Sequence, residues 1–161
     1  ITIETLINKT KAIQSITDVD LIVVDYLQLL MTTNKAPSNS DSRTASMTYI
    51  SNLLKGLAKE ISCPLISLSQ LNRGVEARTD KRPVLSDLRD SGSIEQDADM
   101  VIMLYRQEYY DSLDTGLAEV IIRKNRLGET GEFELGFEGH RSRFVDPEEQ
   151  AFGGKKQYGQ I

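Results

Sequence analysis

The sequence predicts an α/β fold, in which an open, mostly parallel sheet is flanked by helices and carries an antiparallel hairpin at its edge. Residues 20–25, 65–68 and 100–104 are short apolar runs without polar alternation, typical of strands buried on both faces of a parallel sheet. Residues of helical periodicity separate the first two runs. Residues 118–124 and 132–137 flank a glycine-containing turn, which is typical of a hairpin.

Two helices are predicted from apolar residues at helical spacing. The first begins after Thr2, whose side chain can cap a helix, and Glu4 lies in its first turn. The second ends before Pro64, because the residue preceding a proline is pushed out of the helical region. The apolar stripes comprise Ile3, Leu6, Ile7 and Ile13 in the first helix, and Ile50, Leu53, Leu54, Leu57, Ala58 and Ile61 in the second.

The segments between these elements are interpreted as loops. Residues 34–41 are rich in Asn, Ser and Pro, a composition that predicts a mobile loop. Residues 71–92 are charged and weakly periodic, and loops of that length are uncommon unless they are functional or disordered. We therefore expect one domain over residues 1–146 and a flexible polar tail over residues 147–161.

Composition excludes several classes of protein. The 161 residues are 39% hydrophobic and 27% charged, a globular balance that fits neither a disordered nor a collagen-like chain. No apolar run approaches the roughly 20 residues that cross a bilayer, and no secretory leader opens the chain. The single cysteine, Cys63, excludes an internal disulfide framework and a cysteine-based zinc cage. We therefore expect no membrane association and a reduced, cytoplasmic setting.

The net charge of the chain is −5, from 19 basic and 24 acidic residues, and taken alone it argues against strong binding of nucleic acid. Phosphate binding depends on local positive charge, however, and a whole-chain average can hide a basic patch, so this possibility stays open. The chain starts at Ile1 and enters a helical pattern at once, which suggests a fragment of a longer protein.

Two polar residues follow the first two predicted strands. Asp25 ends the first, where a carboxylate can hold a magnesium ion through water, although a plain polar strand end fits the spacing equally well. Gln70 ends the second, and its amide can orient a water and sense a terminal phosphate, because it both donates and accepts. An ordinary strand-end amide is the alternative. Ligands of open α/β sheets sit at the carboxyl ends of the strands, so this edge is the candidate site.

Two basic regions are candidates for phosphate contacts. Strand alternation places Lys124 and Arg126 on one face of the predicted hairpin and Arg123 on the other. Such a pair could reach a phosphate on a neighbouring subunit, as an arginine finger does, or it could be a solvated edge that discourages strand pairing. Residues 73–90 mix basic and acidic side chains, and the amides around Gly92 could contact phosphates; a solvated loop is the alternative.

Four segments of the chain match, in order and spacing, the pattern of a known family. They are Leu-Ile-Val-Val-Asp-Tyr-Leu-Gln-Leu (21–29), Leu-Ser-Gln-Leu-Asn-Arg (68–73), Lys-Arg-Pro-Val-Leu-Ser-Asp-Leu-Arg-Asp-Ser-Gly-Ser-Ile-Glu-Gln-Asp-Ala-Asp (81–99) and Ile-Ile-Arg-Lys-Asn-Arg-Leu-Gly-Glu-Thr-Gly (121–131). Over residues 1–145 the chain resembles bacterial replicative DNA helicases of the DnaB type. The 81–99 block is the most specific of the four matches.

The resemblance implies a RecA-like α/β domain in a homohexameric ring, with ATP and Mg²⁺ bound between subunits. Matched position by position, Asp25 is the Walker-B acid that serves magnesium, and Gln70 is the phosphate-sensing glutamine. Lys124 and Arg126 match the basic pair that the neighbouring subunit contributes to ATP, with Arg126 as the finger. ATP hydrolysis would then drive unwinding of duplex DNA at replication forks.

The resemblance also implies a DNA site and further partners. Arg89, Asp90 and Gly92 match a central-channel loop that grips the backbone of single-stranded DNA. Residues 34–41 would form another loop facing the pore, although this region is shorter than the family pattern. Primase and a helicase loader would be partners through the longer parent protein.

One motif of the family is missing. The chain contains no G-x-x-x-x-G-K-[ST], the loop whose amides and lysine cradle phosphates. In this family that loop, the catalytic glutamate and the primase-binding domain lie upstream of the matched region. We therefore expect a carboxyl-terminal part of the motor that is inactive by itself. The alternatives are another RecA-fold DNA-dependent ATPase of recombinase type, or a non-enzymatic truncated module that docks on a helicase ring.

Overall fold

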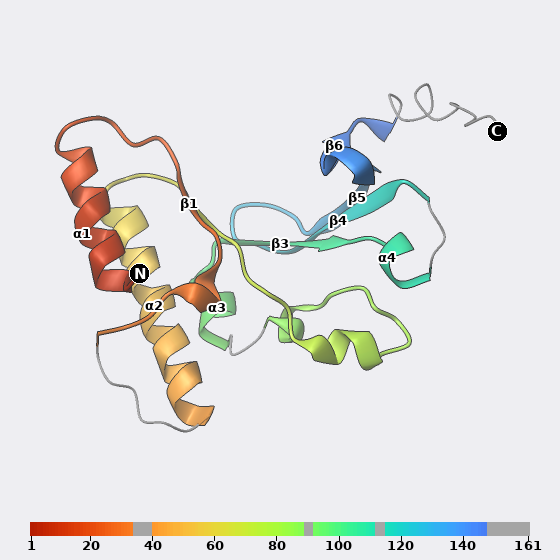
Figure 1. Cartoon of the computed structure of the whole chain (residues 1–161), viewed down its shortest axis with the longest axis horizontal. Helices are drawn as coiled ribbons and strands as arrows, with labels where there is room; N and C mark the ends of the chain where they lie inside the picture. Colours follow the sequence, from red (N-terminus) through yellow and green to blue (C-terminus); the bar gives the residue numbers. More distant parts are fainter. Residues whose placement is uncertain (34–39, 89–91, 112–114, 148–161) are drawn as a thin grey trace, which may run out of the picture. The chain divides into compact units, whose positions relative to one another are not determined.

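The computed structural model divides the chain into two compact units, Ile1–Ala98 and Asp99–Ile161, which are described separately (Figure 1). Arg89, Asp90 and the tail beyond Pro147 lie outside the described residues. Among the helices that are described, none has the length and apolar character to span a bilayer. The described residues are 1–33, 40–88, 92–111 and 115–147.

The first unit contains two long helices and two short strands, together with short helical turns. Both predicted helices and both predicted strands are confirmed. The elements are α1 (Ile3–Gln14), β1 (Ile22–Val24), η1 (Leu27–Leu29), α2 (Ser40–Glu60), β2 (Leu65–Ser67), η2 (Arg73–Ala77), η3 (Leu85–Asp87) and α3 (Gly92–Asp97).

Local chemistry sets the helix ends as the sequence suggested. The Thr2 hydroxyl accepts a hydrogen bond from the Thr5 amide at 3.2 Å and so caps α1. Helix α2 ends in a turn in which Ser62 adopts a left-handed φ of 52° and the Cys63 amide donates to the Ala58 carbonyl at 3.1 Å. At its other end α2 begins at Ser40, inside the segment expected to be a loop.

Strands β1 and β2 are parallel, with Ile22 opposite Leu65 and Val24 opposite Ser67. Between them the chain passes through α2, which is the right length for a crossover connection. Because the strands run in the same direction, their carboxyl ends meet at one edge. The α/β class predicted from the sequence is therefore confirmed.

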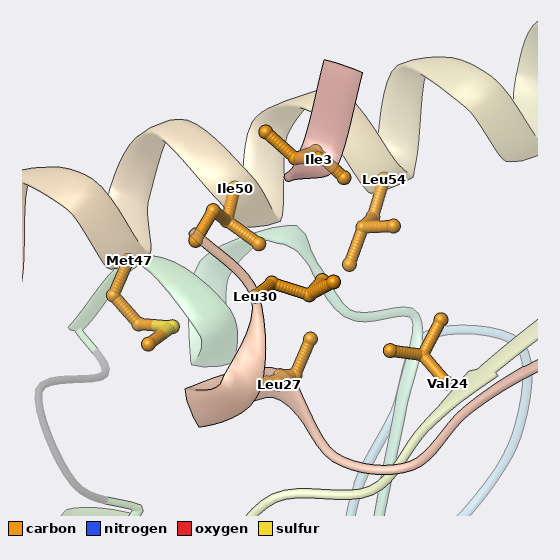
Figure 2. Packing of buried hydrophobic residues seen from close by; sticks show 7 residues of the cluster. All are labelled: Ile3, Val24, Leu27, Leu30, Met47, Ile50 and Leu54. Carbon is orange, nitrogen blue, oxygen red and sulfur yellow. The ribbon is translucent and has the colours of Figure 1, made fainter. Parts of the chain in front are cut away.

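The main core of this unit forms between the two long helices and the strand β1. In Figure 2, Ile50 and Leu54 extend from α2 toward Leu30, and Ile3 is completely buried. Burying such aliphatic side chains contributes about 2 kcal/mol each. The cluster consists of Ile3, Val24, Leu27, Leu30, Met47, Ile50 and Leu54.

The two-faced burial expected of these strands is wrong for the described residues. Val24 is 5% exposed, but Val23 and Ile66 are 58% and 50% exposed. The core residues of α1 and α2 pack against the Val24 side of the strand, and side chains of a strand alternate between faces. Among the described residues of this unit, Val23 therefore has no equivalent cover.

The second unit is an antiparallel sheet in the order β3-β4-β5-β6. The predicted hairpin is confirmed, since Ala118 lies opposite Leu135 and Val120 opposite Phe133. Alternate residues of β3 are buried, in keeping with one covered face. The elements are β3 (Met100–Tyr105), α4 (Glu108–Asp111), β4 (Leu117–Asn125), β5 (Gly131–Glu138), η4 (Gly139–Arg141) and β6 (Arg143–Val145).

The partner of β3 differs from the sequence expectation. The apolar run at 100–104 was expected to be a third strand of the parallel sheet, whereas β3 pairs antiparallel with β4, with Met103 opposite Ile121. The connection between β3 and β4, residues 106–116, is shorter than the crossover of about a dozen or more residues that joins parallel strands, and consecutive strands tend to pair with each other. Strand β6, which pairs with β5, was not predicted.

Candidate functional site

The carboxyl edge of the parallel pair carries the two polar residues that the sequence singled out. Asp25 directly follows β1, and Gln70 lies three residues beyond the end of β2. Both side chains are exposed. The peptide bond between Asp25 and Tyr26 is cis. The structure therefore brings Asp25 and Gln70 to the same edge of one sheet, as predicted.

Hydrogen bonds join the two chain segments beyond the strands themselves. The Leu68 amide donates to the Val24 carbonyl at 2.9 Å, and the Leu27 amide donates to the Leu68 carbonyl, also at 2.9 Å. These bonds hold the segments on either side of Asp25 against the segment that leads to Gln70. The edge is thus a continuous backbone structure rather than two separate loops.

Gln28 completes this edge, and sequence reasoning did not single it out. Its Oε1 accepts a hydrogen bond from the backbone amide of Gln70 at 3.2 Å. Its Nε2 donates to the Ser69 hydroxyl at 3.0 Å and to the Gln70 carbonyl at 3.4 Å. Gln28 lies within the matched 21–29 segment, but its partners are 41 and 42 residues away. Only the register of β1 and β2 reveals the contact.

The donor set at this edge suits magnesium better than a protein-enclosed metal. Among the described residues, no group of three or more His, Cys, Asp or Glu side chains is arranged to hold a metal ion. Asp25 offers a single exposed carboxylate. Mg²⁺ bound with a nucleotide keeps several waters and takes one or two carboxylates plus phosphate oxygens. Asp25 fits that role.

The second unit carries the basic pair. Lys124 lies in β4 opposite Val101, and Arg126 follows the strand. The Arg126 amide donates to the Asp99 carbonyl at 2.9 Å, and its guanidinium lies 3.3 Å from the Asp99 carboxylate. The side chains of Arg126 and Asp99 are about half exposed, at 49% and 58%. Such an exposed ion pair contributes little free energy, so the guanidinium can leave Asp99 for an anion that binds it more strongly.

The predicted DNA-contact residues are only partly described. Arg89 and Asp90 lie outside the described residues. Gly92 is the first residue of α3 rather than a loop residue. Helix α3 is tied to α2 by a hydrogen bond of 2.7 Å from the Ser51 hydroxyl to the Asp97 carboxylate.

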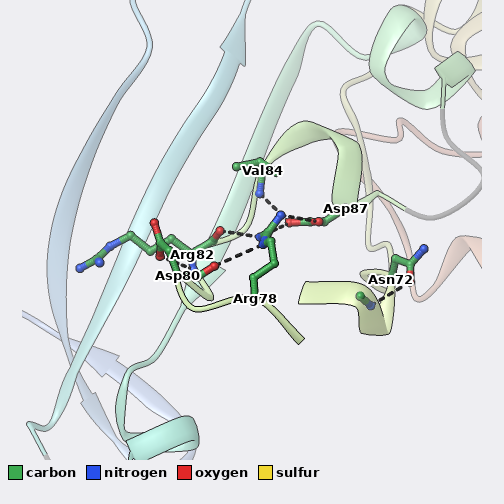
Figure 3. A network of polar contacts seen from close by, with 7 residues as sticks. Asn72, Arg78, Asp80, Arg82, Val84 and Asp87 are labelled. Atoms are coloured by element: carbon green, nitrogen blue, oxygen red, sulfur yellow. Dashed lines mark hydrogen bonds and ion pairs between the residues drawn. The ribbon is translucent and has the colours of Figure 1, made fainter. Parts of the chain in front are cut away.

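Residues 71–88, which precede that segment, contain the short helical turns η2 and η3 and a network of hydrogen bonds, while most of them remain exposed as the solvated-loop alternative expects (Figure 3). Arg78 donates two hydrogen bonds to the carboxylate of Asp87, at 2.9 and 2.7 Å. Asp87 is 7% exposed and also accepts from the Val84 amide at 2.8 Å. Arg78 further donates to the carbonyls of Asp80 and Arg82. A single buried carboxylate therefore organises the turn.

Asn72 joins the other end of this stretch to the same carboxylate-bearing residue. The backbone amide of Asn72 donates to the backbone carbonyl of Asp87 at 2.7 Å. Leu71 and Leu88, next to these residues, form an antiparallel β-bridge. The Asn72 side chain accepts a hydrogen bond from the Gly74 backbone amide at 2.9 Å and so caps the start of η2. No local pattern in the sequence indicates the pairings with Asp87 and Leu88, because the partners are many residues apart.

Comparison with known proteins identifies the family. The profile described as "DnaB-like helicase C terminal domain" matches residues 1–146. The chain is 54% identical over 132 residues to the replicative DNA helicase DnaB of Pasteurella multocida (strain Pm70), covering 81% of this chain and 27% of that protein. It is 44% identical over 142 residues to the DnaB of Geobacillus stearothermophilus, covering 87% of this chain and 31% of that protein. The chain thus spans less than a third of these relatives.

Solved structures agree. A DnaB-like replicative helicase, described with its interactions with primase, superposes with a TM-score of 0.81 at 40% identity, covering 90% of this chain and 36% of that chain. A second solved structure, described as an ATPase domain, superposes with a TM-score of 0.82 at 40% identity, covering 90% and 51%. The RecA-like α/β fold expected from the resemblance is confirmed. The chain belongs to the family of DnaB-like helicase C-terminal domains.

Proposed function

We propose that this chain is part of the ATPase motor of a replicative DNA helicase, in which ATP hydrolysis drives the unwinding of duplex DNA at replication forks. Residues 1–146 contribute to the motor domain, and residues 147–161 are a tail. The observation that carries the proposal is the hydrogen-bonded edge that brings Asp25 and Gln70 together at the carboxyl ends of β1 and β2. In folds of this type ligands bind at that edge.

Asp25 and Gln70 have separate roles in this proposal. The Asp25 carboxylate would hold the Mg²⁺ that accompanies ATP. Gln70 orients the attacking water and detects the terminal phosphate, because its amide offers both donor and acceptor groups. Magnesium, when bound, neutralises charge on the phosphates. Phosphates also need a cradle of backbone amides and a lysine, which the sequence of this chain does not contain.

Lys124 and Arg126 act on the ATP of a neighbouring subunit in a homohexameric ring. An arginine that enters a site in trans stabilises the charge that develops on the transferred phosphoryl group. Arg126 directly follows β4 of the antiparallel sheet, and the hydrogen bond from its backbone amide to the Asp99 carbonyl fixes the backbone that carries the guanidinium. Arg126 is the finger, and Lys124 contributes charge to the same phosphates.

The DNA strand passes residues Arg89, Asp90 and Gly92, with the 34–41 segment as a further contact. Phosphate contacts of this kind fix the strand without reading its sequence. Primase and a loader bind through the longer protein, and one structural relative is itself described with its interactions with primase. The protein acts in the cytoplasm.

The proposal is tested with Asp25→Asn in the full-length protein. Asp20→Asn is the matched control, since Asp20 and Asp25 are both exposed and flank β1. Asp25→Asn is expected to lower magnesium-dependent ATP turnover and unwinding by about 100-fold, because metal-borne charge stabilisation is worth several kcal/mol. Asp20→Asn is expected to leave both unchanged. Normal turnover and unwinding by Asp25→Asn would refute the proposal.

A further inference from the structure

The side chain of Gln28 makes an unusual set of contacts with Gln70. One carboxamide satisfies both the amide and the carbonyl of the Gln70 backbone, at 3.2 and 3.4 Å. A third bond, from Gln28 Nε2 to the Ser69 hydroxyl at 3.0 Å, further restrains the carboxamide. The carboxamide therefore takes the place of a backbone unit and extends the pairing of the two segments by one step.

Gln28 is itself held firmly. It lies in the single turn η1 between Leu27 and Leu30, which are 3% and 8% exposed. The Leu27 amide is bonded to Leu68, and the Leu30 amide donates to the Leu27 carbonyl at 3.0 Å. Two buried leucines and two backbone hydrogen bonds therefore fix the turn that carries Gln28. A side chain on such a base can position its partner.

The side chain and the backbone of Gln70 differ in how they are held. Its side chain is exposed, but its backbone is bonded by Gln28. A residue that senses a phosphate needs an accessible side-chain amide on a fixed backbone, because misplacement of a reacting group by about 1 Å can cost about 100-fold in rate. The structure provides this combination. Turn η1 also begins two residues after Asp25, so the same turn links the two candidate groups.

We propose that Gln28 is a positioning residue for ATP hydrolysis, and that its carboxamide fixes the backbone of Gln70 so that the Gln70 side chain meets the terminal phosphate. The inference rests on the proposed function, since it requires Gln70 to contact nucleotide. Only Gln and Asn carry a carboxamide, which presents a donor and an acceptor side by side, and Asn is one methylene shorter. Gln28→Met keeps the length of the side chain and removes both groups.

The experiment uses the full-length helicase and two nucleotides. Gln28→Met is expected to lower kcat for ATP about tenfold, which corresponds to the loss of one or two net hydrogen bonds. Affinity for a non-hydrolysable triphosphate analogue is expected to fall, while affinity for ADP stays unchanged, because ADP has no terminal phosphate for Gln70 to sense. A merely structural role would lower both affinities together.

Two further variants identify the path of the effect. In a Gln70→Ala background, Gln28→Met is expected to cause no further loss of kcat, because residues that act through one contact are not additive. Gln14→Met is the matched control: the Gln14 side chain donates to the Ile61 carbonyl at 3.1 Å, away from the proposed site. Gln14→Met is expected to keep the wild-type ratio of analogue to ADP affinity.

The outcomes separate the inference from the function on which it rests. Gln70→Ala with wild-type turnover overturns the proposed role of Gln70. If Gln70→Ala is impaired, then wild-type kcat in Gln28→Met, or a full additional loss in the double variant, overturns the positioning role. If Gln28→Met fails to assemble, Gln28→Asn replaces it, since its carboxamide sits one methylene further from the Gln70 backbone. An unchanged affinity ratio in Gln28→Asn then overturns the proposal.

Discussion

Arg78 forms a bidentate ion pair with the buried carboxylate of Asp87, with hydrogen bonds of 2.9 and 2.7 Å (Figure 3). The pair joins residues nine positions apart, and the backbone carbonyl of Asp87 separately accepts a hydrogen bond from the backbone amide of Asn72 at the start of the same stretch. This stretch directly precedes the segment that we propose contacts DNA. Its order is therefore relevant to function as well as to stability.

Loss of this pair is expected to destabilise the first unit. Arg78→Met leaves the buried Asp87 carboxylate with the hydrogen bond from the Val84 backbone amide but without its cationic partner. Removing one partner of a buried ion pair costs about 3 kcal/mol. Arg78 is 35% exposed, so solvent reduces this cost to about 1–2 kcal/mol. Chemical denaturation, with hydrogen exchange of residues 72–88, measures the effect.

The control for this prediction is the exposed pair between Lys11 and Glu60, whose atoms lie 2.7 Å apart. Both side chains are well exposed, at 42% and 59%. Exposed pairs contribute less than about 1 kcal/mol, so Lys11→Met is expected to change stability little. Equal effects of Arg78→Met and Lys11→Met would contradict the assigned role of Asp87.

Ser62 offers a stabilising substitution. Its φ of 52° lies in the left-handed region, which costs a residue with a Cβ about 1 kcal/mol relative to glycine. Ser62→Gly is therefore expected to raise the free energy of unfolding by about 0.5–1 kcal/mol. Thermal unfolding measures this shift. Ser15→Gly is the control, since Ser15 has a helical φ of −69° and should gain nothing; a loss of stability in Ser62→Gly would contradict the geometry of this turn.

Arg89→Ala tests the proposed DNA contact in the full-length protein. Loss of one phosphate contact should weaken binding of single-stranded DNA and reduce the slope of log affinity against log salt by about 0.7. Titration of a fluorescent oligonucleotide at several salt concentrations gives both quantities. Lys9→Ala, on the exposed surface of α1, serves as the control. An unchanged slope in Arg89→Ala would remove Arg89 from the DNA site.

The isolated chain of residues 1–161 is expected to hydrolyse ATP at a negligible rate. Its sequence has no phosphate-cradling loop, and Asp25 alone cannot replace the amides and lysine of that loop. Phosphate release from ATP and magnesium, compared with a buffer blank, measures the rate. Robust turnover by the purified chain would show that a different set of residues performs the chemistry.

The strand-end residues could be predicted from the sequence because the rule they follow is local. Asp25 ends one short apolar run and Gln70 follows the next within a few residues, and parallel strands bring such ends to one edge. The role of Gln28 could not be predicted in this way. Its contact with Gln70 depends on the register between β1 and β2, which sequence periodicity leaves undefined.

The same limit applies to the rest of the fold. The apolar run of β3 does not distinguish a parallel from an antiparallel neighbour, and the structure pairs it with β4. The mixed charges around Arg78 and Asp87 suggested a solvated loop, because composition does not reveal which carboxylate is buried. In both cases the deciding contact joins residues that are not neighbours in the sequence, and for Arg78 and Asp87 the separation is nine positions.

Arg126 is central to the proposed mechanism, which assigns it the completion of ATP hydrolysis in a neighbouring subunit. In full-length hexamers, Arg126→Ala is expected to lower kcat by about 1,000-fold or more, since an arginine finger supplies that factor. Arg123→Ala, at the irregularity of β4 one residue before Lys124, is the control and should retain activity. The deciding measurement compares kcat with the equilibrium affinity for ATP in Arg126→Ala. We expect lost turnover with affinity retained within about threefold, and wild-type turnover would contradict the role of Arg126.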